Sequence, residues 1–196
     1  MQESSNFSLS EENYISWNQA APELNREEAW PAGLFPNAQY HYFKDVGCLV
    51  TSLAIMLRHF GIEEENGENR FNPWILNNRL IEAGAFNPAA DLRLWSINRI
   101  YPLDYLGQIP YSEEIMLNLC RMDYPFLITV TGVKDPRHFL APYKLTGDDM
   151  IVIDPAAGKR CLSEFENIRE LRMFRPRVPV PGCLSLSGHN KKSLLR

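Results

Sequence analysis

Residues 45–61 of the 196-residue chain read DVGCLVTSLAIMLRHFG. From Cys48 to Phe60, apolar side chains recur at helical spacing, and further apolar residues widen the stripe until it covers most of the helix surface. Gly61 is a natural end for this helix, and Gly47 permits tight backbone packing just before it. A helix that is apolar on nearly every side belongs in the middle of a domain. We therefore expect it to be the central element of the fold.

Downstream of this helix, helical patterns are followed by short apolar runs. Asn72 and Pro73 are typical of a helix start, and the helix that they begin ends at Gly84. Residues 92–97 indicate a short helical turn, and Ser112 caps a third helix. Strands are predicted at residues 100–106, 126–131, 138–145 and 150–154, with an edge strand at residues 171–174. Helices followed by an antiparallel sheet are typical of the α+β class.

The length and composition indicate one domain. With 45% apolar residues, a chain of 196 residues can bury a single core. Residues 1–12 are polar and are predicted to be loose, whereas residues 13–175 carry the apolar patterns of the domain. From residue 176 to residue 196, proline, glycine, serine and lysine become frequent, so we expect a partly disordered tail.

Charge and composition argue against several classes of protein. A net charge of −4 does not suit a nucleic-acid-binding surface, which is normally basic. No apolar run approaches the ~20 residues of a membrane helix, and the first residues lack the pattern of a signal peptide. Four cysteines do not form a disulfide framework in a chain of this length. We therefore expect a cytoplasmic protein, with export by a dedicated secretion system as the alternative.

The sequence motifs of metal and phosphate sites are missing. The cysteines and histidines form no Cys-x-x-Cys or His-x-x-x-His pair, which argues against a zinc site. Gly158 and Lys159 lack the upstream glycine and the following hydroxyl residue of a phosphate-binding loop. We therefore expect no metal site and no phosphate-binding loop.

Three side chains with catalytic chemistry follow one another in an informative order. Cys48 begins the central helix, His138 begins a predicted strand, and Asp154 closes the next strand. This is the chain order of a papain-like thiol hydrolase. A helix N-terminus and a nearby imidazolium both favour a thiolate, and a third polar side chain orients the imidazole. The sequence thus predicts Cys48 as nucleophile, His138 as general base and acid, and Asp154 as the residue that orients the ring.

Each of these residues also has an ordinary structural explanation. Cys48 could be a small core residue, because free cysteine is among the most buried residue types. His138 could be a histidine that is hydrogen-bonded inside a sheet, and Asp154 could begin a turn at Pro155. Their joint occurrence in this order favours the catalytic interpretation.

These residues resemble the C39-like peptidases, relatives of the bacteriocin-leader-processing peptidases within the papain-like superfamily. The matching stretches are Gly47–Ala54, Asn72–Pro73, Leu76–Asn77, Leu94–Trp95, His138–Phe139, Ile153–Pro155 with Gly158, Leu162–Ser163 and Arg172–Phe174. The resemblance covers residues 17–175 and implies a papain-like fold, in which a central helix packs on an antiparallel sheet, together with cysteine peptidase activity and no cofactor. It also implies an oxyanion hole in which a glutamine assists the backbone N–H of the nucleophile. Gln19 is the better match to that glutamine, and Gln39 is the alternative.

The leading functional hypothesis is a cysteine peptidase or amidase that hydrolyses a peptide or isopeptide bond through an acyl-enzyme on Cys48. Its substrate would be a peptide, a protein or a fragment of peptidoglycan. Two alternatives stay open. One is an acyltransferase that uses the same three residues, and the other is a catalytically silent binding module that keeps the fold.

Overall fold

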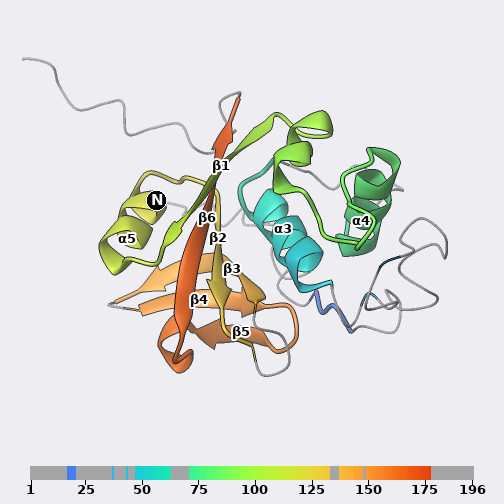
Figure 1. The fold of residues 1–196 in the computed structure, drawn as a ribbon. Coiled ribbons are helices and arrows are strands. Elements are labelled where there is room, and N and C mark those ends of the chain that lie inside the picture. The colour runs from blue at the N-terminus through green and yellow to red at the C-terminus, as the bar shows by residue number, and fades with distance from the viewer. Residues whose placement is uncertain are drawn as a thin grey trace, which may run out of the picture.

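The computed structural model of the chain describes residues 17–20, 37, 43, 47–62, 71–132, 137–147 and 149–177. Within these residues, helices pack on a six-stranded sheet in which every strand pairing is antiparallel (Figure 1). The predicted α+β class is thereby confirmed. Residues 1–12, predicted to be loose, and residues 178–196 of the predicted tail lie outside the described residues, whereas Pro176 belongs to a strand.

The helices begin at the residues that their capping patterns indicate. The described helices are α3 (Cys48–His59), α4 (Pro73–Glu82), α5 (Glu113–Arg121) and the 3-10 helices η2 (Leu94–Arg99) and η3 (Leu162–Glu164). Asn72 Oδ1 accepts a hydrogen bond of 2.9 Å from the N–H of Ile75, and Ser112 Oγ accepts one of 3.4 Å from the N–H of Ile115. Both predicted N-caps are confirmed, because each side chain satisfies a backbone donor that the first turn leaves unpaired.

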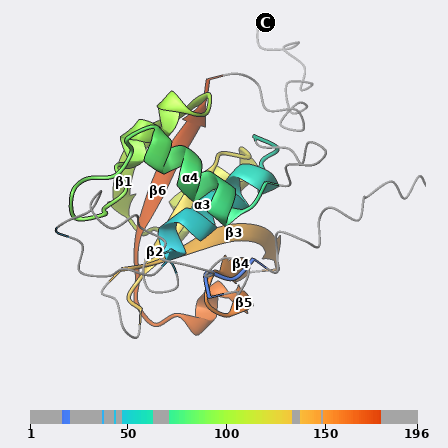
Figure 2. The ribbon, with the colours of Figure 1, turned by 90° about the vertical axis from the view of Figure 1, so that its right-hand side faces the viewer.

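The sheet separates two layers of helices. Its strands are β1 (Leu103–Pro110), β2 (Phe126–Val130), β3 (His138–Thr146), β4 (Asp149–Asp154), β5 (Gly158–Cys161) and β6 (Ile168–Pro176), in the spatial order β1-β6-β2-β3-β4-β5. Helix α3 lies between the sheet and α4 (Figures 1 and 2). Helix α5 covers the opposite face (Figure 1). Side chains alternate between these faces, so that Leu127 packs towards α3 and Ile128 packs towards α5.

The sheet departs from the sequence prediction in three places. The prediction of an edge strand at residues 171–174 is wrong, because β6 is longer and lies between β1 and β2. Within this interior strand, Arg172 is paired with Glu170 at 2.7 Å and lies over the ring of Phe139. Strand β1 begins at Leu103 rather than at residue 100, and β5 was not expected because its sequence, GKRC, has no apolar run.

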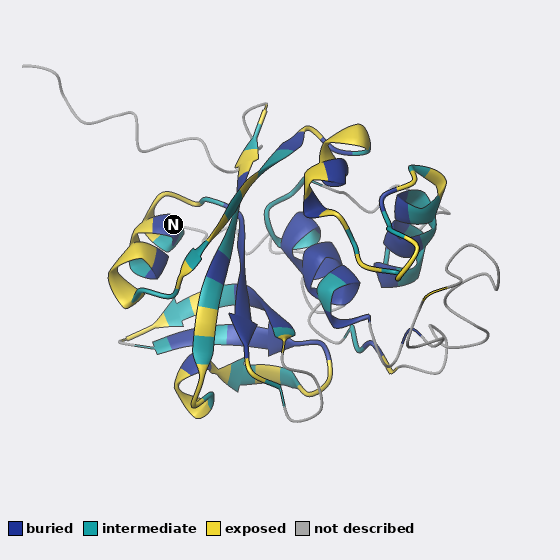
Figure 3. Ribbon diagram, in the orientation of Figure 1, coloured by how far each residue is buried: buried dark blue, intermediate teal, exposed yellow. Residues whose placement is uncertain are grey.

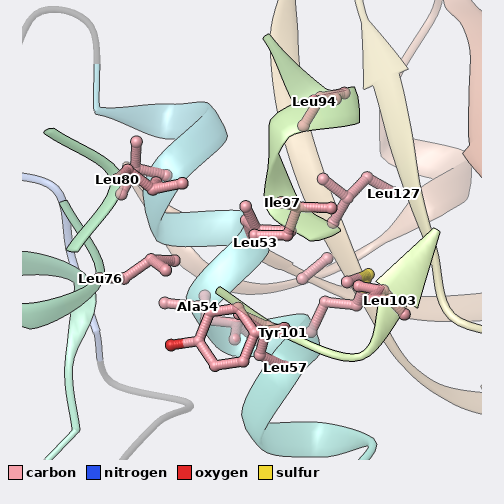
Figure 4. Close-up of a cluster of buried hydrophobic side chains, with 14 of the residues drawn as sticks. Leu53, Ala54, Leu57, Leu76, Leu80, Leu94, Ile97, Tyr101, Leu103 and Leu127 are labelled. Atoms are coloured by element: carbon pink, nitrogen blue, oxygen red, sulfur yellow. The ribbon is translucent and has the colours of Figure 1, made fainter. Parts of the chain in front are cut away.

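Helix α3 lies in the interior of the domain, as its apolar surface predicts. Nine of its twelve residues are buried (Figure 3). Figure 4 shows Leu53 and Leu57 of this helix between Leu76 of α4 on one side and Leu103 and Leu127 of the sheet on the other. Burial of each such leucine contributes about 2 kcal/mol to folding. Within the described residues, no helix combines the length and the hydropathy that crossing a membrane requires.

Candidate active site

The site begins at the N-terminus of α3, where the backbone is tightly packed. The N–H of Gly47 donates to the carbonyl of Phe43 at 2.6 Å, and Cys48 is the first residue of the helix. A Cβ atom at position 47 would lie 2.5 Å from that same carbonyl oxygen, so only glycine fits without a shift of the backbone. The N-cap residue, Gly47, has no side chain with which to cap the helix. Its first N–H groups and its dipole are therefore directed at the region of the Cys48 sulfur.

The structure brings His138 and Asp154 together. His138 is the first residue of β3 and Asp154 is the last residue of β4, and these two strands pair in antiparallel register. Because of this register, the two side chains lie at the same end of the sheet. His138 Nε2 lies 2.8 Å from Asp154 Oδ1, and only 6% of the Asp154 side chain is exposed. The predicted pairing of the imidazole with a carboxylate is thus present in the geometry.

Cys48 also acts on the imidazole of His138. Its thiol is a hydrogen-bonding partner of the His138 ring. Because Nε2 is engaged by Asp154, Nδ1 is the nitrogen that remains for the sulfur. Burial opposes a charge on His138, but the hydrogen bonds with Asp154 and with Cys48 outweigh it and raise the pKa of His138 to about 9. The ring is therefore protonated at neutral pH, which is the state that stabilises a thiolate beside it.

Asp154 is held in its ionised form. Burial by itself would raise the pKa of Asp154, but the bond with His138 and a hydrogen bond from the N–H of Ala156 to Oδ1, at 2.8 Å, lower it below its usual value. The guanidinium of Arg160, 3.7 Å from Oδ2, acts in the same direction. The carboxylate can therefore orient the ring and balance its charge.

Helix and strand are joined by a buried hydrogen bond close to the site. Ser52 Oγ donates to the carbonyl of Phe139 at 2.8 Å. Ser52 lies one helical turn after Cys48, and Phe139 follows His138 directly. The bond therefore fixes how far the helix can slide along β3, and with it the position of the sulfur relative to the ring.

Gln19 lies beside the turn that follows Asp154. Its N–H donates to the carbonyl of Pro155 at 2.9 Å, and the amide of Asn18 donates to the carbonyl of Ala156 at 3.3 Å. Gln19 is 9% exposed. The structure thus brings Gln19 to the same end of the sheet as the other three predicted residues. The alternative, Gln39, lies outside the described residues.

Two residues of this site were missed in the sequence prediction. Ser52 lies in an apolar helix, and nothing in the sequence around it indicates that its hydroxyl bonds the carbonyl of Phe139. Arg160 lies on the strand that was not expected, and because that strand ends before Glu164, no helical spacing indicated their ion pair. Within the described residues, no group of three or more His, Cys, Asp or Glu side chains is arranged to hold a metal ion.

Comparisons with known proteins do not assign the chain to a family. No protein-family model matches the chain, and no curated protein sequence matches it. The arrangement of Cys48, His138 and Asp154 is therefore the basis of the functional proposal.

Proposed function

We propose that the protein is a papain-like cysteine peptidase or amidase, similar to the C39-like group, that cleaves a peptide or isopeptide bond. The observation that carries this proposal is the position of His138, which bonds Asp154 through Nε2 at 2.8 Å and has the Cys48 thiol as its second partner. A histidine that only stabilised a sheet would not need a thiol at a helix N-terminus on one side and a buried carboxylate on the other.

The proposed reaction uses these groups in turn. Proton transfer from Cys48 to His138 gives a thiolate and an imidazolium. The thiolate attacks the carbonyl carbon of the scissile bond, and a tetrahedral oxyanion forms. His138 then donates its proton to the leaving amine as the carbon–nitrogen bond breaks, which leaves an acyl-enzyme on the sulfur. Water, deprotonated by His138, attacks the acyl group and releases the carboxylic acid.

Stabilisation of the oxyanion is assigned to two groups. The backbone N–H of Cys48 lies at the N-terminus of α3, and Gln19 approaches from the segment that bonds Pro155. Because the Pro155 turn also carries Asp154, one short loop supports both the residue that orients His138 and the proposed oxyanion donor. The substrates that we propose are peptides, proteins or peptidoglycan fragments.

Selective alkylation tests the thiolate, and the chain contains its own controls. Burial raises the pKa of the Cys120 thiol to about 11, and desolvation, followed by the carboxylates of Asp149 and Glu164, raises the pKa of the Cys161 thiol. We expect iodoacetamide at pH 6.5 to modify Cys48 at least roughly tenfold faster than either, although Cys161 is exposed and Cys48 is 5% exposed. Rates are read for each cysteine by peptide mapping.

The opposite order of reactivity would contradict the proposal. If Cys161 reacts first and Cys48 stays unmodified in the folded protein, Cys48 is a core residue and the protein is a silent module. Where Cys48 is reactive, a library of peptides and peptidoglycan fragments is incubated with the wild type and with Cys48→Ala. Hydrolysis that needs Cys48 supports the peptidase, whereas products joined to an added amine identify an acyltransferase.

A further inference from the structure

Asp154 has a second oxygen that the proposed triad does not use. Oδ1 accepts the hydrogen bonds from His138 and from the N–H of Ala156, both at 2.8 Å. Oδ2 instead faces the guanidinium of Arg160, whose Nη1 lies 3.7 Å away. An anion that is 6% exposed has little water to stabilise it, so a cation at this distance matters more than it would on the surface.

Arg160 is held in this position from two sides. Its Nε lies 3.0 Å from Glu164 Oε2, and its guanidinium lies 4.4 Å from the ring centre of Phe165. Glu164 is itself fixed, because its Oε1 accepts a hydrogen bond of 2.8 Å from the N–H of Cys161. An arginine with these two supports loses less conformational freedom on pairing with Asp154 than a loose surface arginine would.

We propose that Arg160 is a positioning residue of the site, which acts through Asp154 by keeping its carboxylate ionised and engaged with His138, and that Glu164 holds Arg160 in place. This inference rests on the proposed function. Within the described residues, the charged groups that act on Asp154 are His138 from β3 and Arg160 from β5, and Cys48 of α3 interacts with His138. In the part of the chain that the structure describes, Arg160 is thus the charge that acts on Asp154 from outside the triad.

The positioning role of Arg160 can be tested by measuring the rate of Cys48 capture by iodoacetamide as a function of pH. Protonation of Asp154 removes the partner of the imidazolium, so capture of Cys48 by iodoacetamide falls at low pH. In Arg160→Met, which retains an unbranched side chain over Phe165, we expect this fall to move to higher pH by about half a unit, the size expected of a partly exposed ion pair. Arg160→Lys, which restores the charge, is expected to return the profile towards that of the wild type.

Two controls separate this role from simple loss of structure. Lys159 precedes Arg160 on β5, but its ammonium lies 4.7 Å from the ring centre of Tyr143. Lys159→Met therefore makes the same change of charge away from Asp154, and we expect no shift. In an Asp154→Asn background, Arg160→Met is also expected to shift nothing, because the carboxylate through which it acts is gone. The proposal would be overturned if Arg160→Met slowed Cys48 capture at every pH without shifting the pH profile. It would also be overturned if Arg160→Met shifted the profile equally in the Asp154→Asn background.

Failure of this inference can be told apart from failure of the proposed function. If wild-type Cys48 is captured selectively but Arg160→Met leaves the profile in place, Arg160 has no positioning role and the peptidase proposal stands. If wild-type Cys48 is not captured, the peptidase proposal fails. The effect of Arg160 on the protonation of Asp154 is then measured from the NMR signals of the His138 ring, because the ring lies 2.8 Å from the carboxylate and senses its protonation. If the low-pH transition in these NMR signals has the same midpoint in Arg160→Met as in the wild type, the positioning role of Arg160 is refuted.

Discussion

Ser52 Oγ donates a hydrogen bond of 2.8 Å to the carbonyl of Phe139, and both groups are buried. Residues four apart lie on the same face of a helix, so Ser52 and Cys48 face β3 together. The bond acts on the strand one residue after His138. It therefore fixes the contact between the element that carries the proposed nucleophile and the element that carries the proposed base.

Ser52→Ala should damage this alignment. Removal of the hydroxyl leaves a buried carbonyl without its donor, and we expect the free energy of unfolding to fall by about 1–2 kcal/mol. We also expect slower capture of Cys48 by iodoacetamide, because the helix is no longer fixed against the strand. Urea unfolding and alkylation rates measure the two effects.

Ser96→Ala is the matched control for Ser52→Ala. Ser96 is fully buried, but within the described residues its hydroxyl has no hydrogen-bond partner. Its removal should therefore leave stability nearly unchanged or raise it, and should leave Cys48 capture as it was. Equal losses of stability in the two variants would show that the Ser52 bond contributes nothing specific.

Gly47→Ala should disturb the start of α3. The added methyl group would lie 2.5 Å from the carbonyl oxygen of Phe43 and 2.6 Å from its ring, so the backbone before Cys48 must move. We expect a loss of about 1–3 kcal/mol in unfolding free energy and a clear loss of Cys48 capture.

Gly147→Ala provides the comparison for Gly47→Ala. Gly147 has a φ of +60° in the turn between β3 and β4, with nothing within 4 Å of an added Cβ. The left-handed backbone should cost about 1 kcal/mol, with no effect on Cys48. If Gly147→Ala slowed Cys48 capture as much as Gly47→Ala, crowding at Phe43 would not be the cause.

The stability of the protein should fall as pH rises through the titration of His138. The pKa of this ring is raised from 6.5 to about 9, so its contribution is fully present below pH 6.5 and is lost as pH passes 9. The shift corresponds to at most about 3 kcal/mol. Urea unfolding at pH 6.5 and pH 9.5 measures the loss in the wild type and in His138→Gln, where it should be much smaller. An identical loss in both proteins would refute the assignment to His138.

Gln19→Ala should separate oxyanion stabilisation from nucleophile activation. Loss of one oxyanion donor typically lowers turnover by ~10²–10³. Displacement of iodide from iodoacetamide forms no oxyanion, so Cys48 capture should keep its wild-type rate. Hydrolysis of a peptide identified in the library screen measures the first quantity. If Gln39→Ala, rather than Gln19→Ala, causes the loss of turnover, the oxyanion donor is Gln39.

Local patterns predicted most of the secondary structure. The caps at Asn72 and Ser112 and the apolar surface of α3 appear where expected, because helix ends and buried faces depend on residues close together in the chain. The position of β6 was not predictable in this way. Arg172 fits this interior strand because Glu170 of β6, Thr129 of β2 and the ring of Phe139 of β3 lie around it, and two of these partners come from neighbouring parts of the sheet.

By itself, the sequence determined the α+β class, the central helix and the chemical identity of Cys48, His138 and Asp154 as candidates, since each depends on residue type and local spacing. Only the tertiary structure decided that Asp154 meets Nε2 of His138, that Ser52 ties the helix to β3, and that Arg160 faces Oδ2. The reason is physical. Strand register and helix packing set side-chain distances to within a fraction of an ångström, and both depend on contacts between residues that are far apart in the chain.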